Sequence, residues 1–157
     1  MKAKSGFTLV EILIVVVILG ILAAIVIPQF TEASTEAKTS SLCTDLQSVR
    51  SQIELYKIQH NDNLPGVIKG THTAGATFEQ AMTGYTDIFG EVKLAAGPDI
   101  YGPYLQKMPA NQFVDSSVVI KGTAEPPAVV DDGTQGWYFN TDTGKFRATD
   151  SAAHLGL

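Results

Sequence analysis

An apolar run from Phe7 to Ile27 constrains this chain more than any other feature, and its only charged side chain is Glu11. As a helix rising about 1.5 Å per residue, the run reaches about 30 Å, the thickness of a bilayer core. Lys2 and Lys4 precede it, and no further Lys or Arg occurs until Lys38. The positive-inside rule therefore places the N-terminus in the cytoplasm and the body across the membrane.

The order of these parts differs from that of an ordinary secretory signal. In such a signal the small-residue cleavage site follows the apolar region, which is then discarded. Here the small residue Gly6 comes before the apolar run. A cut after Gly6 leaves the whole apolar segment as the new N-terminus, beginning with Phe7.

The segment Gly6-Phe7-Thr8-Leu9-Val10-Glu11-Ile12, followed by an aliphatic stretch ending near Pro28, resembles the leader and assembly helix of type IV prepilins and type II secretion pseudopilins. The resemblance covers about the first third of the chain. It implies that a prepilin peptidase in the membrane cuts after Gly6 and N-methylates Phe7. It also implies that Glu11 pairs with the α-amino group of Phe7 in a neighbouring subunit.

The residues themselves favour such a pair for Glu11. An acid within a membrane span costs about 2.5–3.5 kcal/mol on insertion scales and usually has a partner. No Lys, Arg or His lies between Phe7 and Lys38. The amine that cleavage creates at Phe7 is therefore the nearby cation that could pair with Glu11. A buried pair between subunits forms only in the correct register. The alternative is that Glu11 is solvated among the cytoplasmic headgroups.

Gly20 and Pro28 weaken the helix between them. Proline lacks an N–H and crowds the carbonyl of Ala24, and glycine costs about 1 kcal/mol of helix propensity. The resemblance implies that this segment unwinds in a filament. The alternative is an ordinary proline kink, with Gly20 and Ala24 forming a small-residue contact between membrane helices.

Composition limits the remainder of the chain. The 157 residues carry a net charge of −5, which argues against a nucleic-acid partner because phosphate binding requires a basic face. The length beyond the span suffices for one small domain.

Cys43 is the only cysteine, so no intrachain disulfide is possible, and we expect it to pack on a helix. Many type IV pilins have a C-terminal disulfide, so its absence favours the major pseudopilins of type II secretion or disulfide-free pilins.

Apolar residues at helical spacing predict that the helix continues beyond Pro28 to about His60 with one buried face. These residues are Phe30, Ala33, Ala37, Leu42, Leu46, Val49, Ile53 and Tyr56. The turn formers of residues 61–66 end the helix. Just before them, the stretch from Ile53 to Lys57 is similar to the same place in the type II major pseudopilins.

Shorter elements are expected in the C-terminal part. Thr77 and Gln80 have capping-box spacing and predict a short helix to about Met82. Residues 101–109 indicate a turn and a one-turn helix. Segments 117–121, 136–139 and 145–148 predict strands, the last two joined in a hairpin. We therefore expect an α+β, pilin-like fold, with a long N-terminal helix packed on a small antiparallel sheet and a short extra helix. The expected parts are a leader (1–6), a transmembrane and assembly helix (7–29) and a globular head (30–157).

No catalytic constellation is recognisable. The three histidines, His60, His72 and His154, are scattered, and the chain has no glycine-rich phosphate loop, so we expect no enzyme.

The resemblance to major pseudopilins allows calcium as the single candidate cofactor. Four acids near the predicted hairpin are the candidate ligands: Asp131, Asp132, Asp142 and Asp150. Solvated acids in turns are the favoured alternative, because the spacing matches no compact calcium loop.

These observations predict a structural subunit of a homo-oligomeric filament assembled from the bacterial inner membrane. The favoured identity is the major pseudopilin of a type II secretion system, with a pilin of a type IV pilus as the alternative. The resemblance implies a prepilin peptidase, an inner-membrane assembly platform and minor pilins or pseudopilins as partners, and a filament in the periplasm or on the cell surface. A single-pass, membrane-anchored periplasmic binding domain, which would need neither Gly6 cleavage nor Glu11, is a further alternative.

Overall fold

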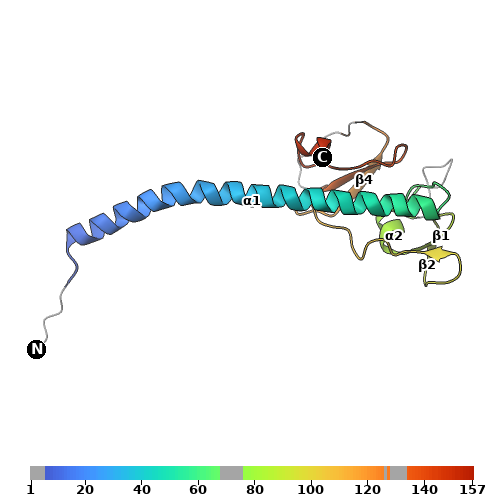
Figure 1. Cartoon of the computed structure of the whole chain (residues 1–157), viewed down its shortest axis with the longest axis horizontal. Coiled ribbons are helices and arrows are strands. Elements are labelled where there is room, and N and C mark those ends of the chain that lie inside the picture. The colour runs from blue at the N-terminus through green and yellow to red at the C-terminus, as the bar shows by residue number, and fades with distance from the viewer. Residues whose placement is uncertain (1–5, 68–75, 126, 128–133) are drawn as a thin grey trace, which may run out of the picture. The chain divides into compact units, whose positions relative to one another are not determined.

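A computed structural model of the chain describes residues 6–67, 76–125, 127 and 134–157 (Figure 1). The chain divides into two units, residues 1–39 and residues 40–157. One helix, α1 (Leu9–Gln59), begins in the first unit and ends in the second. Its bounds confirm the predicted long helix, which includes Pro28 and ends beside the predicted turn.

In the first unit, every described residue from Gly6 to Ala37 is exposed. Threonine hydroxyls after the apolar run bond within the helix. Thr31 Oγ1 donates to the Ile27 carbonyl at 3.1 Å, and Thr35 Oγ1 to the Thr31 carbonyl at 3.0 Å. The hydroxyl groups of these two threonines therefore donate their hydrogen bonds within the helix itself.

In the second unit, α1 buries one face. Residues three or four positions apart are at most 1% exposed, as expected for a helix packed along one stripe: Leu42, Leu46, Val49, Ile53 and Tyr56. Phe30, predicted to continue this stripe, is 73% exposed. Ala33 and Ala37 are exposed as well, so the buried face begins later than the predicted start of the head at residue 30.

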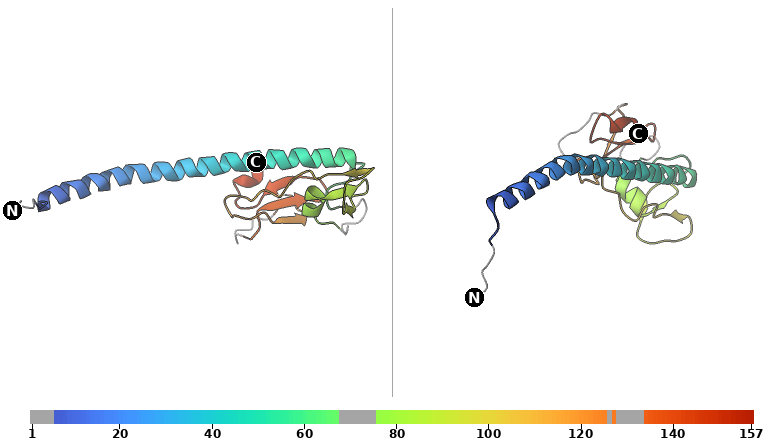
Figure 2. Two further views of the ribbon diagram at one scale, coloured as in Figure 1. Left: turned by 90° about the horizontal axis from the view of Figure 1, so that it is seen from below. Right: turned by 60° about the vertical axis from the view of Figure 1, so that its left-hand side comes forward.

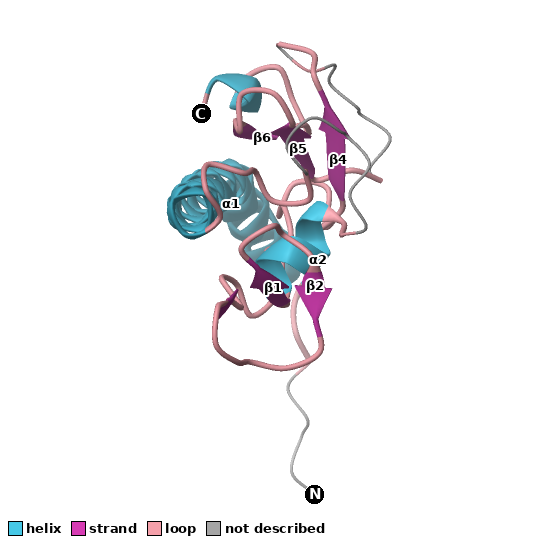
Figure 3. Cartoon of the chain, turned by 90° about the vertical axis from the view of Figure 1, so that its right-hand side faces the viewer, coloured by secondary structure: helices cyan, strands magenta, loops and turns pink. Residues whose placement is uncertain are grey.

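A three-stranded sheet lies beside α1 in this unit (Figures 2 and 3). Its order is β4 (Val119–Gly122), β5 (Trp137–Asn140) and β6 (Phe146–Ala148). β5 and β6 form the predicted antiparallel hairpin, whereas β4 pairs with β5 in parallel. All four residues of β5 are buried, including Trp137 and Tyr138, so this aromatic strand is part of the core.

The remaining elements cover the other end of the buried helix face. α2 (Phe78–Thr83) is followed by a second antiparallel sheet, β2 (Val92–Lys93), β1 (Tyr85–Asp87) and β3 (Ile100–Tyr101). A 3-10 turn, η1 (His154–Gly156), follows β6. The predicted capping box of α2 is confirmed, because Thr77 Oγ1 accepts from Gln80 N at 3.1 Å and Gln80 Oε1 accepts from Thr77 N at 2.9 Å.

The predicted one-turn helix within residues 101–109 is wrong, because this segment contains the end of β3 and then a loop. The N–H groups of Tyr104 and Leu105 both donate to the carbonyl of Met82 at 2.9 Å. A contact distant in sequence thus takes the donors that a local helical turn would use.

Candidate functional site

The segment around the predicted cleavage position lies outside the helix. Gly6, Phe7 and Thr8 precede the first residue of α1 and are exposed, and Phe7 retains 83% of its surface. A Cβ atom placed on Gly6 would meet no heavy atom within 4 Å. The described part of the fold therefore does not require glycine at position 6.

Glu11 closes the N-terminus of α1 through a capping box with Thr8. Glu11 Oε2 accepts from the backbone N of Thr8 and from its Oγ1, both at 2.8 Å. In return, Thr8 Oγ1 accepts from the backbone N of Glu11 at 3.2 Å. This reciprocal arrangement satisfies backbone donors that a helix start otherwise leaves unpaired.

The capping box changes the interpretation of Glu11. Both hydrogen bonds go to Oε2, and within the described part of the chain Oε1 has no bonding partner. The carboxylate can therefore keep its cap and still accept a cation from another subunit. The role of Thr8 was not predicted, although the Thr-x-x-Glu spacing of a capping box is present in the sequence.

The helix surface on both sides of Glu11 is apolar and uncovered. In the described part of the chain, α1 is the one helix that is long and apolar enough to cross a membrane. The side chains of this surface are between 40% and 82% exposed: Leu9, Val10, Ile12, Leu13, Ile14, Val15, Val16, Val17, Ile18, Leu19, Ile21, Leu22, Ile25, Val26 and Ile27. An apolar area of this size requires lipid or other subunits to cover it.

Gly20 and Pro28 lie within this helix, which stays continuous between them. A Cβ atom at Gly20 would also meet nothing within 4 Å. No packing inside the chain therefore explains this glycine. Unwinding in a filament and a small-residue contact between helices both remain predictions for Gly20.

The four candidate calcium ligands do not form one site in the described residues. Asp131 and Asp132 lie outside the described residues. The strand register places Asp142 beyond the Asn140 end of β5 and Asp150 beyond its Trp137 end. The Asp150 carboxylate is already bonded to the amide of Asn111 at 2.7 Å and to His154 Nδ1 at 2.5 Å. Among the described residues, no group of three potential metal ligands is found.

The two described histidines, His60 and His154, form hydrogen bonds within the fold. His60 is fully buried and stacks on Tyr56 with ring centroids 3.7 Å apart. Its Nδ1 lies 2.9 Å from the Tyr56 carbonyl, which can only accept, so Nδ1 carries the proton and Nε2 accepts from Thr86 Oγ1 at 2.9 Å. His154 joins η1 to Asp150, and His72 lies outside the described residues. Cys43 is half-buried on α1, as a packing residue would be.

Comparison with known proteins agrees with this arrangement. Residues 1–27 match the family model described as the prokaryotic N-terminal methylation motif. The chain has a prepilin-type N-terminus.

Curated relatives share the same region. The type II secretion system core protein G of Pseudomonas aeruginosa is 42% identical over 59 residues, which are 38% of this chain and 42% of that protein. The core protein G of Vibrio cholerae is 36% identical over 61 residues, 39% of this chain and 42% of that protein. A fimbrial protein of Pseudomonas aeruginosa is 41% identical over 54 residues, 34% of this chain and 35% of that protein. The chain thus matches less than half the length of these relatives, and no solved structure matches it.

Proposed function

We propose that this chain is a structural subunit of a helical filament assembled from the bacterial inner membrane. The observation that carries the proposal is the N-terminal methylation motif on a helix whose apolar surface is uncovered and holds one acid, Glu11. Such a surface suits two successive environments, the bilayer before assembly and the packed helices of a filament core after it.

The sequence of events follows from the residues at the N-terminus. Lys2 and Lys4 keep the leader on the cytoplasmic side. A prepilin peptidase cuts after Gly6 and N-methylates the new terminal Phe7. The positively charged amine of one subunit then meets Oε1 of Glu11 in a neighbour, while Oε2 keeps the cap with Thr8. An assembly platform in the inner membrane and minor pilins or pseudopilins are the partners that this process needs.

We further propose that the filament is the pseudopilus of a type II secretion system. The names of the core protein G relatives, such as those of Pseudomonas aeruginosa and Aeromonas hydrophila, support this assignment. A type IV pilus is the second candidate, because a fimbrial protein has similar identity over the same region. Deletion of the gene separates the two: loss of exoprotein secretion supports the pseudopilus, and loss of surface filaments with normal secretion supports the pilus.

Intact-mass spectrometry of the chain extracted from its own membranes tests the processing step. We expect a mass that starts at N-methylated Phe7. A chain that retains residues 1–6, or one cut after the apolar segment, would overturn the filament proposal and favour a membrane-anchored binding domain. Gly6→Ala serves as a comparison, because the structure tolerates a Cβ there and any loss of cleavage then reports on recognition by the peptidase.

A further inference from the structure

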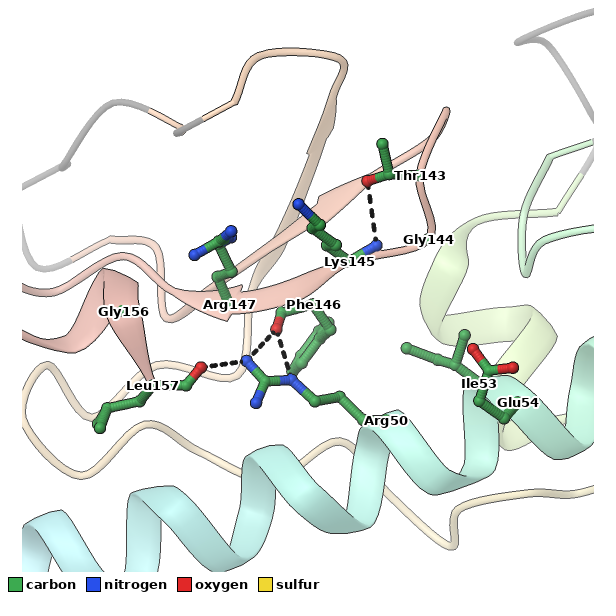
Figure 4. Close-up of a pocket in the computed structure, with 10 residues that line it drawn as sticks. All are labelled: Arg50, Ile53, Glu54, Thr143, Gly144, Lys145, Phe146, Arg147, Gly156 and Leu157. Atoms are coloured by element: carbon green, nitrogen blue, oxygen red, sulfur yellow. Dashed lines mark hydrogen bonds between the residues drawn. The ribbon is translucent and has the colours of Figure 1, made fainter.

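A cavity of about 390 Å³ lies between α1 and the β5–β6 hairpin (Figure 4). Three basic side chains line it, Arg50, Lys145 and Arg147, against one acidic side chain, Glu54. The chain as a whole has a net charge of −5, so this concentration of positive charge is a local exception. We call this cavity the Arg50 pocket.

Arg50 is fixed in position at the wall of the pocket. Its Nε and Nη2 donate to the carbonyl of Phe146 at 3.0 and 2.8 Å, and Nη2 also donates to the backbone oxygen of Leu157 at 2.5 Å (Figure 4). Within the described residues, no aspartate or glutamate side chain forms an ion pair with Arg50. Burial, and then the charge of Arg147, lower the pKa of Arg50. The guanidinium is thus partly desolvated beside a second cation.

The acids near the pocket are already engaged. Glu54 pairs with Lys57 at 3.1 Å. Glu125 forms ion pairs with two cations, Arg147 at 3.1 Å and Lys145 at 3.8 Å. Lys145 also keeps 55% of its side-chain surface exposed. The lining of the pocket therefore has more basic than acidic side chains and fits a carboxylate side chain that comes from outside the chain.

The chain itself carries a matching pair of acids. Glu32 and Glu36 are exposed, and in the described part of the chain neither one makes an ion pair. They lie four residues apart on α1, so their Cβ atoms are about 6 Å apart on one face of the helix. They lie on the same helix shortly after the apolar run, which ends at Ile27, so subunits that pack through that run bring these acids near neighbouring copies. A carboxylate moved out of water into such a contact needs a cation to offset its desolvation.

We propose that the Arg50 pocket of one copy receives the side chains of Glu32 and Glu36 of a second copy, which pair with Arg50 and Lys145. The inference rests on the filament function proposed above and names the contact that fixes one subunit against the next. It requires four side chains: two exposed acids on one copy and two cations on the other.

Charge reversal in the full chain, expressed in its own host, tests this contact. We expect Lys145→Glu, and separately the double variant Glu32→Arg/Glu36→Arg, each to give about tenfold less sheared filament or lower, because like charges then face each other. Combining both changes restores opposite charges at position 145 but leaves Arg50 facing an arginine, so filament yield should recover in part. Immunoblots of processed protein in the membrane show that each variant is made and inserted.

Lys107→Glu is the matched control, since it reverses an exposed cation outside the pocket and should leave the yield unchanged. Arg50→Glu is a further variant, with its thermal unfolding measured in detergent because Arg50 also binds the hairpin. Wild-type yield from the acid double variant or from Lys145→Glu would overturn the contact and leave the filament function standing, as would a combined variant whose yield is no higher than that of the acid double variant. A wild-type chain that is processed but forms no filament would instead overturn the function itself.

Discussion

Glu11 combines a helix cap, which the structure shows, with the role in assembly that we propose for it. Its Oε2 closes the helix by accepting both bonds from Thr8, and in the proposed filament its Oε1 receives a cation from another chain. The sequence predicted that this acid needs a partner, since an acid in an apolar span is costly. The partner within the same chain went unpredicted, although a Thr-x-x-Glu spacing indicates it.

His60 gives a prediction at the same scale. Burial lowers the pKa of His60 from its ordinary value of 6.5, although the Tyr56 carbonyl partly opposes the shift. Protonation would place a proton on Nε2, which now accepts from Thr86. The unfolded chain binds this proton more readily than the folded chain, so the stabilising contribution is complete above about pH 6.5 and declines as the pH falls below that value.

Thermal unfolding of the second unit, followed by circular dichroism from pH 7.5 to 5, measures this decline. His60→Gln lacks a titrating group and should lose less stability over the same range, even though it is less stable at neutral pH. Parallel pH profiles for the wild type and His60→Gln would contradict the assignment of the decline to His60.

At the scale of elements, the sequence predicts those whose signals are local. The apolar stripe from Leu42 to Tyr56, the capping box of α2 and the β5–β6 hairpin all depend on residues close together in the chain. The sheet of β1, β2 and β3 was not predicted, because strands of two or three residues carry too little periodicity to recognise. The parallel pairing of β4 with β5 joins distant segments and was likewise not predicted.

Gly20 gives a prediction for the assembly helix. Gly20→Ala adds a methyl group in open space and raises helix propensity by about 1 kcal/mol. Processing and membrane insertion should therefore be unchanged. If the helix must unwind between Gly20 and Pro28 during assembly, the more stable helix should lower filament yield, which electron microscopy of sheared filaments measures.

Ser48→Ala, which raises helix propensity at an exposed position of α1 outside this segment, is the control for this experiment. Ala24→Leu tests the alternative, in which Gly20 and Ala24 form a small-residue contact between helices. A bulky residue at position 24 disrupts such a contact but adds little helix propensity. A normal filament yield from Gly20→Ala would contradict unwinding.

At the scale of the whole molecule, the described hydrophobic packing is confined to one of the two units. The described hydrophobic core belongs to the second unit and includes no residue before Leu42. We therefore expect a fragment of residues 30–157 to be a soluble, folded and mostly monomeric domain. Circular dichroism and sedimentation velocity check this, and filaments formed by the fragment would place the assembly surface in the head instead of in the apolar helix.

Filament formation by a Glu11→Gln variant tests the central claim most directly. Glutamine at this position can still accept the two capping bonds from Thr8, so the helix start and membrane insertion should be preserved while the negative charge is lost. The Phe7 amine of a neighbour would then enter the apolar core without its carboxylate, and leaving one member of a buried pair alone costs about 3–5 kcal/mol. Electron microscopy of sheared filaments, with immunoblots of processed protein in the membrane, should show processed Glu11→Gln subunits and almost no filaments. Normal filaments from Glu11→Gln would contradict the account, because the acid would then act only as a helix cap.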